Sequence, residues 1–262
     1  MLRELSYNPH VRRIIKSSGM QRLAQDLYYR FTGPDDGVTT LGCLGIAASF
    51  SAANVGELRR VEAATITEHS TMDGLLSHLS EGDCFMDVGS EYGVYAILAA
   101  KLVGPAGLSI AIEPYSPSYA ILKKNVEMNE LQNVLLFPLA LGDCETSIGM
   151  ADMRDGEVAC ATPCGSGSIA AMRGDELIRQ NGLPVPNVVK MDIEGYEYKA
   201  LLGLQETLKS PVCRILCCEI HPMLLPDRLE PDVVIDLIRE YGFTTMNVAK
   251  RGPEIHVLAE KG

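Results

Sequence analysis

Residues 86–93, with the sequence MDVGSEYG, constrain the fold of this chain more than any other segment. They join a short apolar stretch, which follows a turn at Gly82 and Asp83, to a run of good helix formers at residues 94–103. Glycine adopts backbone angles that other residues avoid, and its missing side chain lets a ligand approach the main chain. The N–H groups in the first turn of the following helix favour an anionic group. The segment therefore predicts a strand-to-helix turn that binds a nucleotide-type cofactor.

The residues around this turn indicate which cofactor it binds. Residues 108–112 form a second predicted strand that ends at Glu113, where an acidic side chain can hold both hydroxyls of a ribose. The spacing is D-x-G-x-x-x-G, because Asp87 stands where the dinucleotide fingerprint has its first glycine. Asp87 could accept hydrogen bonds from a ligand amine or hydroxyl. The pattern favours S-adenosylmethionine over a nicotinamide cofactor, and a purely structural glycine turn is the alternative.

Strand and helix patterns alternate through the rest of the chain. Further strands are predicted at residues 134–141, 188–192, 214–220, 243–248 and 255–260, and helices at residues 70–79, 116–129, 195–204 and 232–241. Such alternation implies an α/β fold with a mostly parallel, doubly wound sheet. Residues 144–186 are the least regular part of the chain. A connection of this length is usually functional or has small elements of its own.

Residues 1–56 are predicted to form an N-terminal extension. Residues 1–31 carry apolar side chains at roughly helical spacing and several arginines, which predicts one or two helices, and residues 38–51 read as a β-hairpin. The favoured interpretation is that the helices pack on the body with a solvated basic face. The alternative is a surface that meets an acidic acceptor or a membrane-bound glycolipid.

Composition excludes some classes of protein. The net charge of −11 argues against nucleic acid as the main partner. Residues 37–56 are uncharged over the length of a membrane span, but they are too rich in Gly, Ser and Thr for one, so no transmembrane segment is expected. Arg3 and Glu4 interrupt any early apolar run, which argues against a signal peptide. The 8 cysteines include no C-x-x-C pair, which fits reduced thiols in a cytoplasmic protein.

Several motifs together resemble the FkbM family of S-adenosylmethionine-dependent methyltransferases. They are Asp87-Val88-Gly89-Ser90-x-x-Gly93, Glu113-Pro114, Ala140-Leu141-Gly142-Asp143, Glu219-Ile220-His221 and, most specific, Lys190-Met191-Asp192-Ile193-Glu194-Gly195. The likeness covers residues 57–262 and implies a class I methyltransferase (Rossmann-like) domain with a seven-stranded sheet whose last strand is antiparallel. It also implies O-methylation of a sugar, polyketide or other small-molecule hydroxyl. Glu91-Tyr92 departs from the family, which usually has Asn followed by a small or apolar residue.

Ligands of an open α/β sheet lie beyond the carboxyl ends of the strands, which places the candidate site. The methionine part of the cofactor is expected at Gly89 and Gly93, the ribose at Glu113, and the adenine near Leu141. The complete cofactor-binding set is Asp87, Gly89, Ser90, Tyr92, Gly93, Glu113, Pro114, Leu141 and Asp192.

Methyl transfer to a hydroxyl requires alignment of the acceptor and removal of its proton. The candidate catalytic residues are Asp192, Glu194 and His221, with a neutral His221 of ordinary pKa as the first choice for the proton acceptor. Each has a structural alternative: Asp192 could cap the next helix, Glu194 could pair with a lysine, and His221 could be a satisfied structural histidine.

The sequence leaves some functions open. No metal is expected, because Asp192 and Glu219 with His221 offer few ligands for a hard cation. The predicted partner is a small-molecule or carbohydrate acceptor, most simply a sugar or glycoconjugate, and a second copy of the chain in a homodimer is left open. The alternatives are methylation of RNA or another macromolecule, a nucleotide-binding oxidoreductase, and a non-catalytic binding module.

Overall fold

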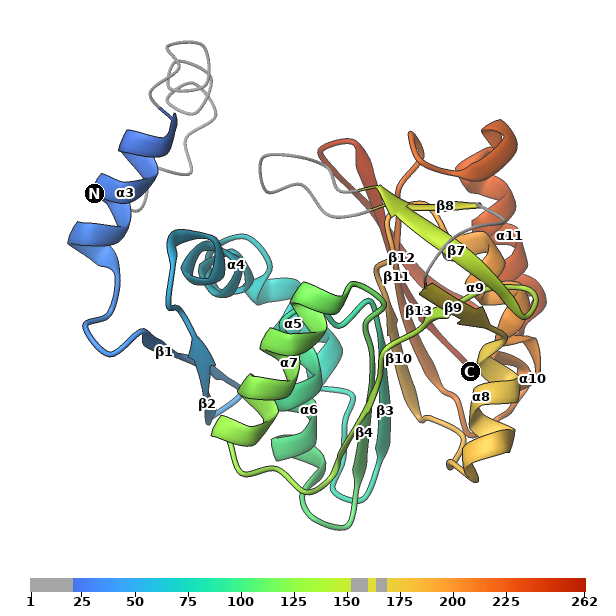
Figure 1. Ribbon diagram of the computed structural model, residues 1–262. Coiled ribbons are helices and arrows are strands. Elements are labelled where there is room, and N and C mark those ends of the chain that lie inside the picture. Colours follow the sequence, from blue (N-terminus) through green and yellow to red (C-terminus); the bar gives the residue numbers. More distant parts are fainter. Residues whose placement is uncertain (1–20, 152–159, 164–168) are drawn as a thin grey trace.

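A central seven-stranded sheet organises the computed structural model, which describes residues 21–151, 160–163 and 169–262 (Figure 1). Its strands are β3 (Cys84–Val88), β4 (Leu108–Ile112), β5 (Val134–Phe137), β10 (Val188–Met191), β11 (Ile215–Ile220), β12 (Thr245–Arg251) and β13 (Glu254–Glu260). They lie in the order β12-β13-β11-β10-β3-β4-β5. Strands β3, β4, β5, β10 and β11 run parallel, whereas β13 is antiparallel to both of its neighbours. The predicted doubly wound α/β sheet of the class I methyltransferase type is confirmed.

Helices cover both faces of this sheet, as Figure 1 shows. One face carries α5 (His69–Leu76), α6 (Val94–Val103) and α7 (Ser116–Met128), and the other carries α8 (Gly174–Asn181), α9 (Glu197–Gly203), α10 (Gln205–Lys209) and α11 (Pro231–Glu240). Successive strand residues point to opposite faces, so Phe85 packs with the first helix layer and Met86 with the second. Because both faces are covered, the central strands are buried throughout, which explains their continuous apolar sequences.

The segment expected to be irregular contains a second, smaller sheet. Strands β6 (Ala140–Leu141), β7 (Thr146–Ala151), β8 (Cys160–Pro163) and β9 (Ile169–Met172) form a four-stranded sheet in the order β6-β9-β7-β8. The single strand predicted at residues 134–141 is divided between β5 and β6. Pro138 lies between them and has no N–H to donate to a ladder, which accounts for the break.

The N-terminal region packs against helices α6 and α7 through its own hairpin. It comprises α3 (Gln21–Thr32), the predicted hairpin of β1 (Val38–Cys43) and β2 (Ile46–Ser51), and α4 (Val55–Ile66). Asn125 on α7 accepts the N–H of Ser51 at 2.8 Å. In Figure 1 the hairpin lies beside α7, and α3 projects at the outer edge. Residues 1–20, which carry most of the predicted basic helical segment, lie outside the described residues, and the division at residue 56 stays a prediction.

No helix within the described ranges is long and apolar enough to cross a membrane.

Candidate active site

A cavity opens at the carboxyl ends of β3, β4 and β10, where the sequence placed the site. The expected site residues that line it are Gly89, Ser90, Tyr92, Glu113, Pro114, Leu141, Asp192 and Glu194. Asp87, Gly93 and His221 do not belong to the lining. Additional lining residues that were not among the predicted site residues are Arg60, Ala64, Glu68, Tyr95, Lys190 and Tyr196. The first three come from α4 and the segment after it, so the N-terminal region supplies part of the wall.

The backbone conformation and the packing of the turn itself favour glycine at both positions. Gly89 has φ +84°, and a Cβ there would lie 1.9 Å from the carbonyl oxygen of Asp192. Gly93 has φ +83°, and a Cβ there would lie 2.3 Å from Cδ1 of Leu122 on α7. The sequence predicted that these glycines allow a ligand to approach closely. The structure gives a second reason for them, because the turn itself packs against the end of β10 and against α7.

Glu113 is bonded to the turn by its own carboxylate. Its Oε2 accepts the N–H of Glu91 at 2.8 Å, and its Oε1 accepts the N–H of Tyr115 at 2.7 Å. Burial raises the pKa of Glu113 to about 7, although both N–H groups act in the opposite direction. A carboxylate has about four lone-pair sites, so Glu113 can accept further hydrogen bonds beside these two. Its role in holding the ribose stays a prediction.

Asp87 lies beneath the cavity and contacts a lysine. Its side chain is 1% exposed, and its Oδ1 lies 3.6 Å from Nζ of Lys190. The same Nζ lies 3.6 Å from Oδ2 of Asp192 and 4.8 Å from the centre of the Tyr95 ring. Burial raises the pKa of Asp87 to about 6, while Lys190 lowers it. Burial alone would lower the pKa of Lys190, but Asp87 and Asp192 outweigh it and raise that pKa. Asp87 therefore forms a buried ion pair with Lys190, and its expected contact with the cofactor stays a prediction.

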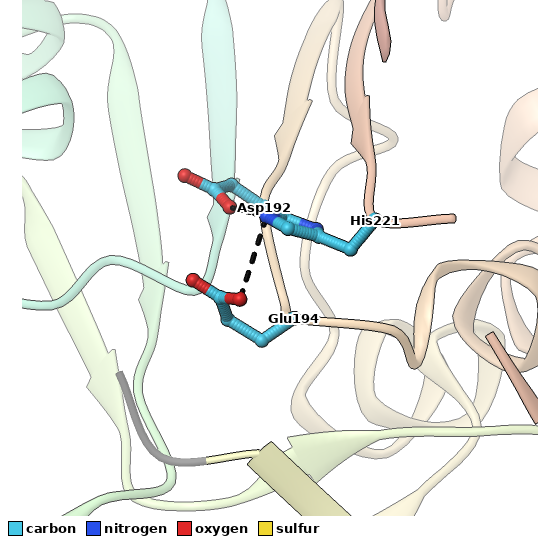
Figure 2. Close-up of side chains that lie close together, drawn as sticks. All are labelled: Asp192, Glu194 and His221. Carbon is cyan, nitrogen blue, oxygen red and sulfur yellow. Dashed lines mark ion pairs between the residues drawn. The ribbon is translucent and has the colours of Figure 1, made fainter. Parts of the chain in front are cut away.

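The three candidate catalytic side chains converge at the ends of β10 and β11 (Figure 2). Nε2 of His221 lies 3.5 Å from Oε2 of Glu194 and 3.7 Å from Oδ1 of Asp192. Glu194 has φ +52°, an uncommon conformation for a residue with a side chain. Such strain is held by the surrounding structure and is often found at functional sites.

Glu197 completes this group and was not among the residues predicted from the sequence. Its side chain is fully buried in the first turn of α9, and its Oε1 lies 2.7 Å from Nδ1 of His221. The same oxygen accepts the N–H of Gly195 at 2.8 Å. A carboxylate in the first turn of the helix was visible in the sequence, but nothing there indicated that it faces a histidine 24 residues away.

The charge of His221 differs from the sequence expectation. Burial lowers its pKa, but the hydrogen bond and charge of Glu197, followed by the charges of Glu194 and Asp192, raise it to about 9. The imidazole is therefore protonated at neutral pH, not neutral with an ordinary pKa. Burial raises the pKa of Glu194 to about 7, and the charge of His221 limits that rise. Of these two groups, the carboxylate is the better placed to take a proton near neutral pH.

Among the residues that the structure describes, two groups of side chains have the composition of cation sites. Asp192, Glu194 and His221 form one, and Glu219, Glu254 and His256 form the other, with ligand atoms within 4.8 Å of one another in each. The ion pairs within both groups already balance part of the charge. The expectation that no metal takes part stays a prediction.

Comparisons with known proteins agree with the motifs. The model of the methyltransferase FkbM domain matches residues 83–245. The chain is 28% identical over 206 residues to the hexuronic acid methyltransferase AglP of Haloferax volcanii, covering 77% of this chain and 80% of that protein. Among solved structures, it resembles a precorrin-6y C5,15-methyltransferase from Geobacter metallireducens, with 14% identity, TM-score 0.49, and coverage of 75% of this chain and 90% of that one. A methyltransferase FkbM from Methylobacillus flagellatus has 15% identity, TM-score 0.46, and coverage of 70% and 44%.

Proposed function

The chain belongs to the FkbM family of methyltransferases, and on that premise we propose that it methylates a hydroxyl of a sugar or glycoconjugate. It is an S-adenosylmethionine-dependent enzyme. The main support for a hydroxyl acceptor is Glu194, a carboxylate with pKa raised to about 7 at the edge of the cavity. Support for a carbohydrate comes from the relative named as a hexuronic acid methyltransferase.

The cavity fits an adenosine-containing cofactor. Ile112, Pro114, Ala140 and Leu141 provide apolar lining for the adenine, and Glu113 provides acceptors for the ribose hydroxyls. Asp192 and Glu194 line the same cavity beyond the carboxyl ends of the strands. When bound, the cofactor supplies a methyl group on a sulfonium, which leaves readily. The remaining task of the protein is to orient the acceptor and remove its proton.

Glu194 is the proposed proton acceptor. General-base catalysis is most efficient when the pKa of the base lies near the working pH, and about 7 meets this condition. Asp192 lies on the other side of Nε2 of His221, and its carboxylate could accept a hydrogen bond from a neighbouring hydroxyl of the acceptor. In this arrangement Glu194 would take the proton of the acceptor hydroxyl, and Asp192 would help to orient that acceptor.

His221 and Glu197 act as positioning residues. The protonated imidazole lies against Asp192 and Glu194, so its positive charge offsets the repulsion between the two carboxylates. Glu197 holds the ring through Nδ1 and keeps it protonated. Loss of that proton would leave the carboxylates to repel each other and would misplace the base.

Two measurements test the proposed function in turn. Calorimetry should show saturable binding of S-adenosylhomocysteine and none of NAD, and the reverse result would favour the oxidoreductase alternative. Transfer of a labelled methyl group should then be assayed against panels of neutral sugars, uronic acids, small phenols and total RNA. Transfer to sugar hydroxyls supports the proposal. Transfer to RNA alone would replace it with the macromolecular alternative.

A further inference from the structure

Glu91 occupies an unusual position in the cofactor turn. It has φ +52°, lines the cavity, and donates its N–H to Glu113. Burial raises the pKa of its carboxylate to about 7, whereas Arg60 lowers it. The turn therefore places a second carboxylate next to Glu113, the residue proposed to hold the ribose.

Arg60 is the partner of Glu91 and also lines the cavity. Its Nη2 forms an ion pair with Oε1 of Glu91. Arg60 and Lys190 are the cationic residues of the lining within the described chain. Lys190 is nearly buried between Asp87 and Asp192, whereas the side chain of Arg60 is 34% exposed. A guanidinium has five N–H donors, so an ion pair through one nitrogen leaves capacity for a carboxylate ligand.

Helix α4, which carries Arg60, is held in place by hydrogen bonds at its start and to α3. The side chain of Asn54 accepts the N–H of Glu57 at its start, and Glu57 Oε2 accepts the hydroxyl of Ser51 at 2.6 Å. Tyr28 on α3 donates its hydroxyl to Glu62 at 2.5 Å. This helix precedes the segment matched by the family model, residues 83–245. Arg60 is thus a cavity residue that the family match does not include.

We propose that Arg60 and Glu91 bind the amino-acid end of S-adenosylmethionine, Arg60 taking the carboxylate and Glu91 the ammonium group. The methionine part of this cofactor is a zwitterion, so its receptor needs a cation and an anion side by side. Arg60 and Glu91 supply this pair next to the turn that the methionine part is expected to meet. Binding would exchange one internal ion pair for two ion pairs with the ligand and would leave neither side chain without a partner. The assignment rests on the cofactor of the proposed function.

Two ligands that differ in the amino-acid group test this assignment. S-Adenosylhomocysteine has both charges, whereas 5′-methylthioadenosine has the same nucleoside without either. In calorimetry, Arg60→Gln and Glu91→Gln should each lower the affinity for S-adenosylhomocysteine by about 10- to 100-fold, the scale of hydrogen bonds to charged groups. Affinity for 5′-methylthioadenosine should change less than about twofold, since it makes no such bond. Arg239→Gln, on the exposed face of α11, is the matched control.

A third ligand separates the two roles. Decarboxylated S-adenosylmethionine keeps the ammonium and lacks the carboxylate, so Glu91→Gln should weaken it and Arg60→Gln should not. Equal loss of affinity for all ligands in either variant would mean that the pair only holds α4 in place, and it would overturn the inference. Unchanged affinity for S-adenosylhomocysteine in both variants would overturn it too. A wild-type protein that binds none of these ligands would instead contradict the proposed function.

Discussion

The two ends of the cavity are built in different ways. At the turn end, Gly89, Gly93 and Glu113 are fixed through the backbone, by positive φ angles, close packing and accepted N–H groups. At the carboxylate end, His221, which follows β11, is held by side chains of the segment after β10 and of α9. The structure of the turn end depends on residues that can adopt its backbone conformation. The structure of the carboxylate end depends on the balance between the charge of His221 and the charges of the carboxylates around it. Substitutions at the first should therefore change binding, and substitutions at the second should change turnover and its pH dependence.

The largest effect is expected from Glu194→Gln. The amide cannot take a proton from the acceptor, so the turnover number should fall by about 10² to 10⁴, the usual range for loss of a general base. Calorimetry should find the affinity for S-adenosylhomocysteine within about twofold of wild type, since the ribose and adenine contacts remain. Glu240→Gln, an exposed change on α11, is the control. Near-normal turnover would move the role of base to Asp192.

Glu113→Ala tests the other end. Removal of a carboxylate that accepts ribose hydroxyls should weaken binding of S-adenosylhomocysteine by about 1.5–3 kcal/mol, the scale of hydrogen bonds to a charged group. Turnover at saturating cofactor should stay near the wild-type value. Because Glu113 also accepts the N–H groups of Glu91 and Tyr115, Glu113→Gln should be measured beside it, with exposed Glu127→Ala as the control. If Glu113→Ala lost turnover but kept its affinity for S-adenosylhomocysteine, the proposed difference between the two ends, binding at one and turnover at the other, would be wrong.

The pH profile sharpens the contrast at the carboxylate end. The rate should rise as pH increases through about 7, when Glu194 loses its proton, and fall through about 9, when His221 loses its own. Glu197 raises the pKa of His221, so Glu197→Gln should move the alkaline limb down by about one unit or more. The acid limb should move little. A wild-type rate that stays constant far above pH 9 would indicate that a neutral imidazole is the active form.

The smallest effect is expected from chelation. EDTA should leave the wild-type rate within experimental error, because the positive charge at the carboxylate end comes from His221. Loss of activity that Mg²⁺ restores would show this prediction to be wrong. Calorimetric binding of Mg²⁺ to Asp192→Asn and to Glu219→Gln would then distinguish the two groups that could hold the ion.

How far the sequence could predict these features depends on how local their causes are. The turn, the strands beside it and the order of elements follow from short patterns, and so does the edge of the sheet where the site lies. Arg60 and Glu197 could not be found this way, because each acts through a contact with a residue distant in the chain. The charge of His221 depends on three carboxylates that only the fold brings together. The break at Pro138 was visible in the sequence. Small elements were allowed for in the segment that follows, but their pairing into one sheet was not predicted.

The packing of Gly89 against the carbonyl oxygen of Asp192 limits how this enzyme could be redesigned. The backbone of the turn and the backbone at the end of β10 touch without a side chain between them, so neither can shift without moving the other. A library that varies loop length on either side of this contact should yield mostly misfolded proteins. Side-chain changes around Asp192 and Glu194 leave the contact intact. Selection for a new acceptor, in the laboratory or in evolution, would therefore proceed through side-chain substitutions within a fixed main chain.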